Sequence, residues 1–233
     1  MQRTVFLTGG TGYLGSRLIP ALLARGHRVR ALVRPKSSGR LPAGCEAVVG
    51  DALDAASYAD RVAPADTFVH LVGTPHPAPW KAAEFERVDF ASVRAAAEAA
   101  RAAGVEHFVY LSVAHPAPAM RAYWRVRAEG ERLLAREAFP STFVRPWYVL
   151  GPGHRWAYLA IPLYLLAEGI PATRATARRL GLVTLPQMID TLAWAVDHPA
   201  KKLRAIGVPE IRAGNAAAAR DGLEVLLPAS ERA

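Results

Sequence analysis

Residues Thr8–Gly15 read TGGTGYLG and decide the fold of this chain. The segment follows a short β-prone run and opens a helical one, which is the context that a dinucleotide-binding glycine loop requires. Gly9 permits a tight turn, Gly12 lets the backbone approach a pyrophosphate, and Gly15 lets the helix pack closely against the strand. The first N–H groups of that helix then point at the phosphates. The segment therefore predicts a dinucleotide site.

Short β-prone runs alternate with helical stretches as far as residue 146, which predicts a parallel sheet covered by helices on both faces. The expected strands are 4–8, 29–33, 46–49, 67–72, 107–112 and 142–145. The expected helices are about 12–25, 55–61, 84–103 and a segment that contains Tyr123 and ends near residue 137. The fold class is therefore α/β, a doubly wound parallel sheet of the Rossmann type with a small C-terminal lobe.

The sequence changes character near residue 150, where proline and glycine punctuate the chain and one clear helix remains, at 187–196. We expect residues 1–149 to form the dinucleotide-binding Rossmann domain. Residues 150–233 are expected to form a small substrate or lid lobe that is not independent. If the aromatic side chains near this boundary line a pocket, they predict an apolar or aromatic substrate; otherwise they pack. They are Trp147, Tyr148, Trp156, Tyr158 and Tyr164.

Composition limits the other classes of function. The chain has 233 residues, of which 52% are hydrophobic and 21% charged, as expected for a folded domain. Its net charge of +9 comes from basic residues dispersed along the chain, which favours a solvated surface over a nucleic-acid site. The single cysteine, Cys45, excludes an internal disulfide and suits the cytoplasm, and the histidines lack metal-ligand spacing. The most apolar run, residues 157–166, is far shorter than the roughly 20 residues that span a bilayer.

The end of the second strand indicates which nicotinamide cofactor the loop binds. A carboxylate at this point would bind the ribose 2′-hydroxyl of NAD, but the chain continues with Arg34 and Lys36 instead. Cations at this point suit a 2′-phosphate, because they form charge-assisted hydrogen bonds with it. We therefore expect NADP, with NAD as the alternative if Arg34 is only a surface cation.

The ends of the third and fourth strands are the next candidates for cofactor contacts. Asp51 follows the third strand, and its carboxylate can accept a hydrogen bond from the adenine amino group. Its alternative role is to cap the following turn. Leu71, Val72 and Gly73 follow at the end of the fourth strand, where a small residue would let the cofactor pass.

These features together resemble the extended and atypical short-chain dehydrogenase/reductase (SDR) superfamily, in the branch of NmrA-like, complex I subunit-like and NAD-dependent epimerase/dehydratase-like proteins. The resemblance is carried by TGGTGYLG, Asp51, HLVG at 70–73, YLSV at 110–113, Tyr123 with AEGE at 128–131, and RPWYVLGPG at 145–153. The expected cofactor-binding residues are Gly9, Thr11, Gly12, Tyr13, Leu14, Gly15, Arg34, Asp51, Ala52, Leu71, Val72, Gly73, Arg127 and Pro146.

The resemblance also implies a catalytic group, in which Ser112, Tyr123 and Arg127 correspond to the family's serine, tyrosine and lysine. In the family's chemistry the tyrosine exchanges a proton with a carbinol while hydride moves to or from the nicotinamide. Two features of the sequence agree with this assignment. Ser112 ends a parallel strand, where ligands collect, and Tyr123 and Arg127 lie four residues apart on one helix face.

Arg127 departs from the family's lysine, and its consequence is open. A free phenol has a pKa of about 10, so it needs a nearby cation to act as a base at neutral pH. Arginine keeps the charge and can donate to ribose hydroxyls, but it cannot pass a proton. Either the site no longer needs the chemistry of lysine, or arginine supports a slow or specialised reaction. The remaining alternative is a solvent-facing Tyr123 and Arg127 beside an ordinary strand-end Ser112.

We therefore predict an NADP-preferring oxidoreductase that acts on a carbonyl or alcohol of an apolar small molecule. A non-catalytic NAD(P)(H)-binding sensor or assembly factor is the alternative. Epimerase or dehydratase chemistry comes third, because the C-terminal part is short and apolar for a nucleotide sugar. The expected partner is the small-molecule substrate, with no nucleic acid, metal or transmembrane segment, and a homodimer is compatible with the chain.

Overall fold

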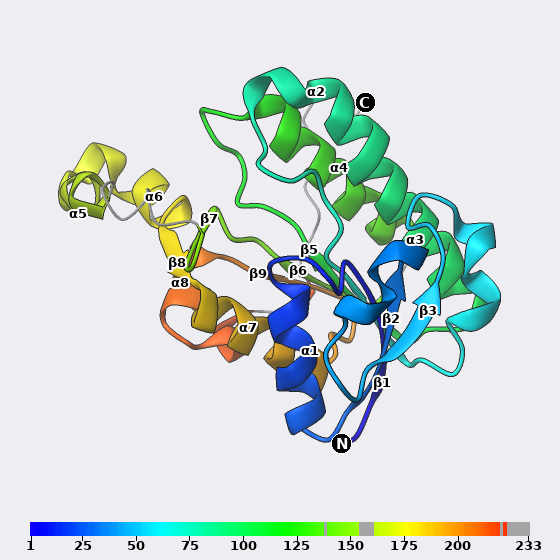
Figure 1. The fold of residues 1–233 in the computed structure, drawn as a ribbon. Helices are drawn as coiled ribbons and strands as arrows, with labels where there is room; N and C mark the ends of the chain where they lie inside the picture. The colour runs from blue at the N-terminus through cyan, green and yellow to red at the C-terminus, as the bar shows by residue number, and fades with distance from the viewer. Residues whose placement is uncertain (138, 154–160, 220, 223–233) are drawn as a thin grey trace.

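The computed structural model of the chain describes residues 1–137, 139–153, 161–219 and 221–222. Its centre is a seven-stranded sheet in the order β3-β2-β1-β4-β5-β6-β9, in which every neighbouring pair is parallel (Figure 1). The strands are β1 (Thr4–Thr8), β2 (Arg28–Val33), β3 (Glu46–Val49), β4 (Thr67–His70), β5 (His107–Leu111), β6 (Ser141–Val144) and β9 (Leu203–Ile206). The order reverses between β1 and β4, so this is the doubly wound Rossmann sheet and the predicted fold class is confirmed.

Side chains alternate between the two faces of the sheet, and each face has its own core. Val5 and Leu7 of β1 belong to one buried cluster, whereas Phe6 between them belongs to the other. The first cluster packs under α1 (Gly15–Ala24) and α7 (Leu185–Asp197). The second packs under α3 (Ala91–Ala102) and α4 (Arg121–Arg136), on the opposite face.

The helix predicted at 84–103 is not one regular helix. It consists of α2 (Ala82–Glu84), the π-helical segment η5 (Phe85–Phe90) and α3. A π-helical turn holds one residue more than an α-helical turn and often occurs at functional sites. The short helix predicted at 55–61 is also wrong in type, because two 3₁₀ turns lie there, η2 (Ala55–Ser57) and η3 (Ala59–Arg61).

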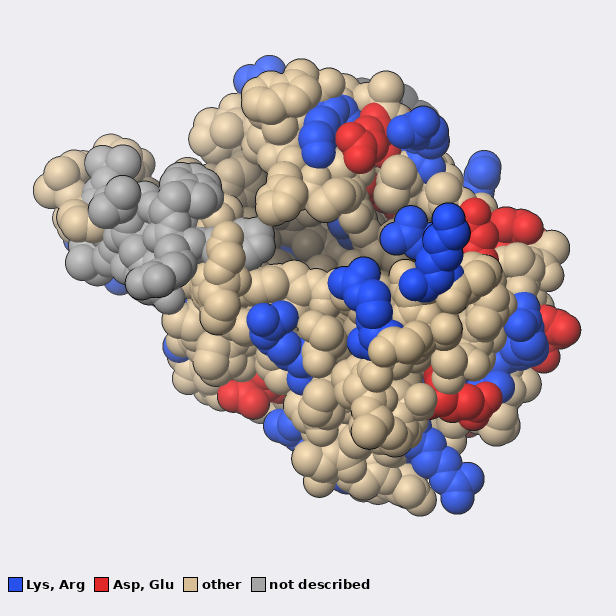
Figure 2. All heavy atoms as spheres, viewed as in Figure 1, with Lys and Arg blue, Asp and Glu red and all other residues tan. Residues whose placement is uncertain are grey.

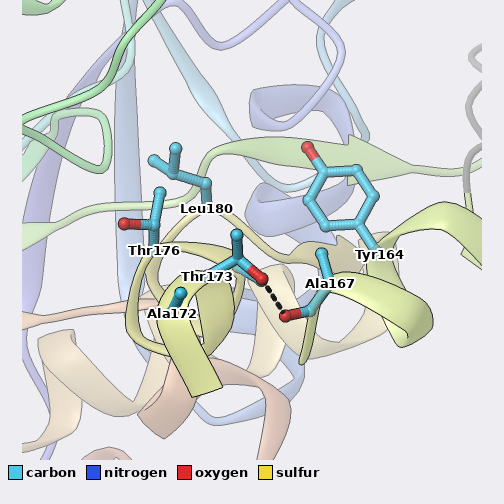
Figure 3. A pocket seen from close by; sticks show the side chains of 7 residues that line it. Tyr164, Ala167, Ala172, Thr173, Thr176 and Leu180 are labelled. Carbon is cyan, nitrogen blue, oxygen red and sulfur yellow. Dashed lines mark hydrogen bonds between the residues drawn. The ribbon is translucent and has the colours of Figure 1, made fainter. Parts of the chain in front are cut away.

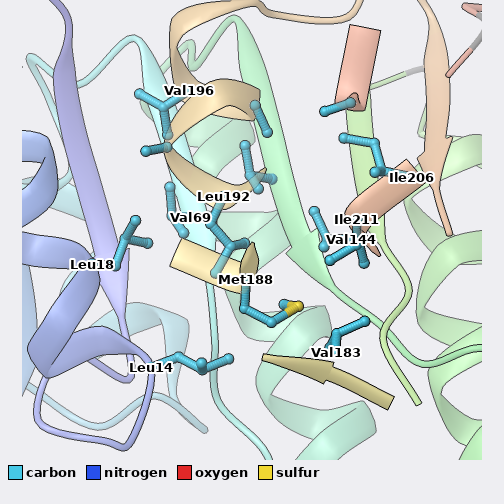
Figure 4. Packing of buried hydrophobic residues seen from close by; sticks show 14 of the residues in the cluster. Leu14, Leu18, Val69, Val144, Val183, Met188, Leu192, Val196, Ile206 and Ile211 are labelled. Atoms are coloured by element: carbon cyan, nitrogen blue, oxygen red, sulfur yellow. The ribbon is translucent and has the colours of Figure 1, made fainter. Parts of the chain in front are cut away.

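Residues beyond 150 contribute to the same sheet and core. β9 pairs with β6, and α7 lies against the sheet face that α1 also covers. Figure 4 shows Met188, Leu192 and Val196 of α7 directed at buried side chains of the sheet, such as Val69. Full burial of such a side chain stabilises the fold by about 1.5–3 kcal/mol. A capping box between Thr184 and Gln187 starts this helix.

The rest of the C-terminal part surrounds a small second sheet, in which β7 (Tyr148–Leu150) pairs with β8 (Leu182–Thr184). The helices α5 (Ile161–Gly169) and α6 (Pro171–Arg179) project from the body of the molecule at the left of Figure 1. The remaining short helices are η1 (Pro35–Arg40), η4 (Pro79–Lys81), α8 (Val208–Arg212) and η7 (Ala216–Ala218). Within the described ranges, every helix is too short or too polar to cross a lipid bilayer.

Candidate active site

The glycine loop folds tightly between β1 and α1. Gly9 has a positive φ of 82° and its carbonyl accepts a hydrogen bond from the Gly12 N–H at 3.0 Å. A Cβ atom on Gly15 would overlap the Gly9 carbonyl oxygen, so only glycine allows α1 to begin this close to the loop. This closeness brings the N-terminus of α1 to the C-terminal end of β1, where a pyrophosphate fits. The loop therefore has the geometry of a dinucleotide cradle.

The other loop residues differ in what they offer a cofactor. Gly12 is exposed and Thr11 is half-buried, so both are accessible. The Leu14 side chain packs in the core, which leaves only its backbone for a cofactor. The ring of Tyr13 lies 4.8 Å from the Arg17 guanidinium carbon, and a Cβ on Gly151 would overlap its hydroxyl. Tyr13 therefore links the loop to the segment after β7.

Charged residues follow β2 and β3, where the adenosine half of the cofactor is predicted to bind. Arg34 and Lys36 follow β2 with exposed side chains, and neither forms an ion pair with a described residue. Asp51 caps the next turn, because its Oδ1 accepts a hydrogen bond from the Leu53 N–H at 3.0 Å. The capping role predicted as the alternative is thus present, and adenine binding by Asp51 and the adjacent half-buried Ala52 stays a prediction.

The segment after β4, residues 71–73, is in close contact with the glycine loop and with Arg127. A Cβ on Gly9 would lie 3.0 Å from the Leu71 carbonyl carbon, so the loop and this segment are in close contact. Val72 and Gly73 are half-buried. A Cβ on Gly73 would overlap Nη2 of Arg127, which occupies the space above this residue. Gly73 was expected to be small so that the cofactor could pass. In the structure its missing side chain makes room for the Arg127 guanidinium.

Arg127 is buried and held by two partners. Its Nη2 lies 2.7 Å from Oδ1 of Asp89, and its Nη1 donates to the Leu111 carbonyl at 2.9 Å. Burial alone would lower the pKa of Arg127, but Tyr123, Tyr110 and Asp89 raise it above its ordinary value, so the guanidinium stays charged. The solvent-facing alternative for Arg127 is therefore wrong.

The Tyr123 ring adjoins this guanidinium, and Ser112 follows the residue whose carbonyl binds it. The Arg127 guanidinium carbon lies 5.5 Å from the centre of the half-buried Tyr123 ring, which packs on Phe85 with centres 5.1 Å apart. Ser112 follows Leu111, the residue whose carbonyl binds Arg127. Its Oγ is buried and has no hydrogen-bond partner among the described residues, which is uncommon for a buried hydroxyl. Arg127 therefore connects Tyr123 to the C-terminal end of β5, which Ser112 follows in the chain.

A second charged cluster on α4 fixes the loop after Ser112. Glu131 is buried, and its carboxylate accepts a 2.9 Å hydrogen bond from Arg145 Nε and faces His115 Nε2 at 3.4 Å. Burial alone would raise the pKa of Glu131, but its contacts with His115 and Arg145 hold it below the ordinary value. The His115 ring also stacks on Trp124, with centres 6.1 Å apart.

Backbone contacts extend this support on both sides of the loop. The Pro146 carbonyl accepts from the Ala114 N–H at 2.8 Å, so the segment after β6 lies beside the segment after β5. Arg179 Nε of α6 donates to the Pro116 carbonyl at 3.1 Å. The projecting α5–α6 unit is thus tied to the loop that follows Ser112.

Two residues that matter at the site, Asp89 and Glu131, were missed from the sequence. The signals for Glu131 were its place in the AEGE run at 128–131 and its position four residues after Arg127 on the same face of α4. His70, in contrast, is structural: its Nδ1 lies 2.8 Å from Thr8 Oγ1 and its Nε2 3.2 Å from Ser92 Oγ. Burial and the nearby Arg127 lower the pKa of His70 to about 3, so its ring is neutral.

The surface above the strand ends is hollowed. Figure 2 shows a depression in the middle of this face, between the region of α1 and the region of α4, with Lys and Arg side chains at its edge. Parallel sheets of this type bind ligands at the C-terminal ends of their strands. The basic edge suits the phosphates of a dinucleotide.

A separate cavity of about 380 Å³ lies between α5 and α6. Figure 3 shows the Thr173 hydroxyl turned to the Ala167 carbonyl, to which it donates at 2.6 Å, so the wall is largely apolar. Of the aromatic residues expected either to line a pocket or to pack, Tyr164 lines this cavity, Trp147 packs against the core, and Trp156 and Tyr158 lie outside the described residues. The lining residues are Tyr164, Ala167, Ala172, Thr173, Thr176, Ala177 and Leu180.

Comparison with known proteins identifies the family. A family model described as NAD(P)H-binding matches residues 9–155, which include the glycine loop, Ser112, Tyr123 and Arg127. The chain belongs to the NAD(P)H-binding family. The predicted membership of an NAD(P)-binding family and the expected class of cofactor, a nicotinamide dinucleotide, are thereby confirmed.

Two curated relatives and one solved structure illustrate the similarity. The chain is 35% identical over 178 residues to ceramide reductase of Caulobacter vibrioides, covering 75% of this chain and 55% of that protein. It is 29% identical over 168 residues to 4-hydroxy-2-methyl-3-oxo-4-farnesyl-3,4-dihydroquinoline-1-oxide ketoreductase of Stigmatella aurantiaca, covering 63% and 50%. The chain thus spans about half the length of these relatives.

The fold is similar to that of a short-chain dehydrogenase/reductase superfamily protein from Agrobacterium tumefaciens with bound NAD. The TM-score is 0.64 at 20% identity, and the match covers 88% of this chain and 77% of the other. At this identity the likeness supports the fold, and the site rests on the geometry described above.

Proposed function

We propose that the protein is an NAD(P)(H)-dependent oxidoreductase that interconverts a carbonyl and an alcohol on an apolar small molecule. The observation that carries the proposal is the buried Ser112 hydroxyl, which has no hydrogen-bond partner among the described residues and follows the strand end that binds Arg127, the neighbour of Tyr123. A buried hydroxyl of this kind suits a hydrogen bond to the reacting oxygen of a substrate.

The residues divide the chemistry among them. When bound, the nicotinamide supplies or accepts the hydride. Tyr123 gives its phenolic proton to the carbonyl oxygen during reduction and takes it back during oxidation, while the Ser112 hydroxyl donates a hydrogen bond to the same oxygen. Arg127 supplies positive charge beside the Tyr123 ring and remains protonated throughout. Residues of the glycine loop hold the pyrophosphate.

The proposed cofactor is NADP, because two exposed cations follow β2 without ion-pair partners among the described residues. Arg34→Ala is expected to weaken NADPH binding about tenfold and NADH binding little, since only NADPH carries a 2′-phosphate. Titration calorimetry measures both affinities. Arg28→Ala is the matched control, because Arg28 is exposed at the other end of the same strand. Tighter binding of NADH than of NADPH by the wild type would overturn the preference.

The proposed substrate is apolar, and two observations support this. The cavity between α5 and α6 has a largely apolar wall, and the unit that forms it is tied to the loop after Ser112 through Arg179 and Pro116. Two relatives are named for a ceramide and for a farnesyl-bearing quinoline oxide, both of which carry long apolar groups. We infer that the apolar part of the substrate occupies the α5–α6 cavity while its carbonyl reaches Ser112.

One experiment tests the reaction. NADPH oxidation is followed against medium- and long-chain aliphatic ketones and aryl ketones for wild type, Tyr123→Phe and Arg127→Lys. Tyr123→Phe is expected to lower kcat at least about 100-fold without weakening cofactor binding. Tyr58→Phe is the matched control, because Tyr58 is buried in the core and its hydroxyl has no partner among the described residues.

The outcomes separate the proposed enzyme from its alternative. Turnover that survives Tyr123→Phe would exclude the assigned proton donor. Binding of NADPH without turnover in any variant would favour a nucleotide-binding sensor or assembly factor over an oxidoreductase.

A further inference from the structure

The π-helical segment η5 faces the catalytic helix α4 with two side chains, and each of them meets one member of the predicted pair. Phe85 packs on Tyr123, with ring centres 5.1 Å apart. Asp89 forms the ion pair with Arg127, at 2.7 Å. The two residues on η5 are four apart, as are Tyr123 and Arg127 on α4. Tyr123 and Arg127 are thus positioned by a neighbouring element as well as by their own helix.

Asp89 is itself anchored on its other oxygen. Oδ2 accepts hydrogen bonds from the Thr74 N–H at 2.9 Å and from the Thr74 hydroxyl at 2.6 Å. Thr74 follows Gly73, the residue whose missing side chain leaves room for the guanidinium. The carboxylate is therefore held by Thr74 on one oxygen while its other oxygen faces the Arg127 guanidinium.

We propose that Asp89 is a positioning residue that holds Arg127 above Gly73 and cancels the positive charge beside the bound nicotinamide ring. This inference rests on the proposed function, because it assumes that the nicotinamide lies at Tyr123 and Arg127. Asp89 differs in role from the three residues predicted to act on the substrate, because its contacts are with Arg127 and Thr74.

The other titratable groups described around Arg127 are either neutral or paired with other residues. The positive charge of Arg127 is therefore balanced by the negative charge of Asp89. His70 is neutral, because burial and Arg127 lower its pKa to about 3. Tyr110 is neutral as well, since burial raises its pKa above the ordinary value. Glu131 is paired with Arg145 and His115. One guanidinium and one carboxylate therefore sum to zero beside Tyr123.

This balance predicts how the site ranks the two forms of the cofactor. The oxidised nicotinamide ring carries a positive charge and the reduced ring carries none. A lone guanidinium would disfavour the oxidised ring through charge repulsion, whereas a neutralised one would not. The ratio of the dissociation constants of NADP⁺ and NADPH therefore reports the charge that the ring meets, and it requires no substrate.

The test measures this ratio by titration calorimetry at low salt and pH 8. Asp89→Asn leaves a net positive charge, so the ratio is expected to rise about three- to tenfold. The double variant Asp89→Asn/Arg127→Lys carries the same net charge on a smaller cation. The double variant is therefore also expected to raise the ratio. If Asp89→Asn does not fold, the double variant by itself tests the inference.

Two controls separate charge from general damage. Arg127→Lys keeps the pair neutral, so its ratio is expected to stay within about twofold of wild type even if both affinities fall. Glu131→Gln removes a buried carboxylate from α4 one helical turn further along, and its effect on the ratio is expected to be smaller than that of Asp89→Asn.

Two results would overturn the inference. One is a wild-type ratio in both variants that carry the extra charge. The other is an equal change of the ratio in Arg127→Lys, which would indicate lost geometry and not charge. The proposed reaction fails separately, because turnover is measured in the ketone assay. If the ratio shifts but no ketone is turned over, the positioning role of Asp89 stands and the proposed reaction fails. If ketone is turned over but the ratio does not shift, the positioning role of Asp89 fails.

Discussion

Helix α4 carries two buried charge clusters that differ in their access to water. In the first, which we call the Arg127 cluster, Arg127 and its partner Asp89 are 3% and 0% exposed. In the second, the Glu131 cluster, Glu131 is 1% exposed. The side chains of its partners Arg145 and His115 are 19% and 18% exposed. A charge that loses its partner in the first cluster has no route to solvent, whereas the cations of the second can turn outward. The same helix therefore holds one closed pair and one half-open cluster.

Removing the carboxylate of the closed pair is expected to have the largest effect on stability. Asp89→Ala leaves the guanidinium of Arg127 buried and unpaired, and should lower the free energy of unfolding by about 3–5 kcal/mol. Urea unfolding at pH 7.5 measures the change. A loss below about 1 kcal/mol would mean that water reaches Arg127, and the contrast between the clusters would disappear.

A double variant controls for this result. Asp89→Leu/Arg127→Met replaces the pair with apolar side chains of similar size. It is expected to lie no more than about 1 kcal/mol below wild type, because a buried ion pair contributes little net stability over good packing. A double variant as unstable as Asp89→Ala would point to lost shape and not to an orphaned charge.

The Glu131 cluster should respond less strongly to the same kind of change. Glu131→Gln keeps an oxygen for Arg145 and leaves partly exposed cations, so the expected loss is about 2 kcal/mol in the same urea assay. Asp89→Asn, measured in parallel, is the matched substitution and should cost more. Equal losses would contradict the difference in solvent access.

The smallest predicted effect is a difference between the two clusters in how the free energy of unfolding depends on pH. The pKa of His70, beside Arg127, falls to about 3, so below pH 6.5 the unfolded chain binds a proton that the folded chain does not. Its contribution to stability is therefore complete above pH 6.5 and is lost as the pH falls, by about 1.4 kcal/mol at pH 5.5. The pKa of Glu131 is held below 4.5, so its contribution is lost only at pH values below that.

Unfolding at pH 7.5 and pH 5.5 tests this separation. Wild type should lose stability between these values, with His107 contributing as well, since burial also lowers its pKa to about 3. His70→Asn should lose about 1.4 kcal/mol less than wild type over this interval, while Glu131→Gln should follow wild type. An unchanged pH dependence in His70→Asn would assign the loss to other groups.

The sheet could be predicted from the sequence because its signals are local. Each predicted strand is a short β-prone run, and Gly12 and Gly15 are required by contacts with Gly9 and Gly10 of the same loop. The C-terminal part carries weaker signals. β9 is four residues long and begins directly after two lysines, and it becomes a strand because β6 offers it an unpaired edge. That kind of pairing is not encoded in the strand alone.

The candidate site could be predicted only in part, for a related reason. Tyr123 and Arg127 share a regular helix, so their common face follows from spacing. Asp89 lies in η5, where the backbone departs from 3.6 residues per turn, and a helical projection drawn through 84–103 misplaces it relative to α4. Because the helix geometry changes locally, the sequence did not predict that Asp89 pairs with Arg127. It also did not predict that Gly73 leaves room for the Arg127 guanidinium.

The π-helical turn has a further consequence for the length of the chain. Because such a turn holds one residue more than an α-helical turn, η5 is equivalent to a one-residue insertion inside an otherwise regular helix. Deleting one residue between 85 and 90 would restore the regular helix and leave α3 in its place against the sheet. The residues on either side of the deletion would keep the faces they have now, because a π-helical turn and an α-helical turn each complete one rotation about the helix axis. A codon deleted between Phe85 and Asp89 would thus change the four-residue spacing that matches them to Tyr123 and Arg127 on α4.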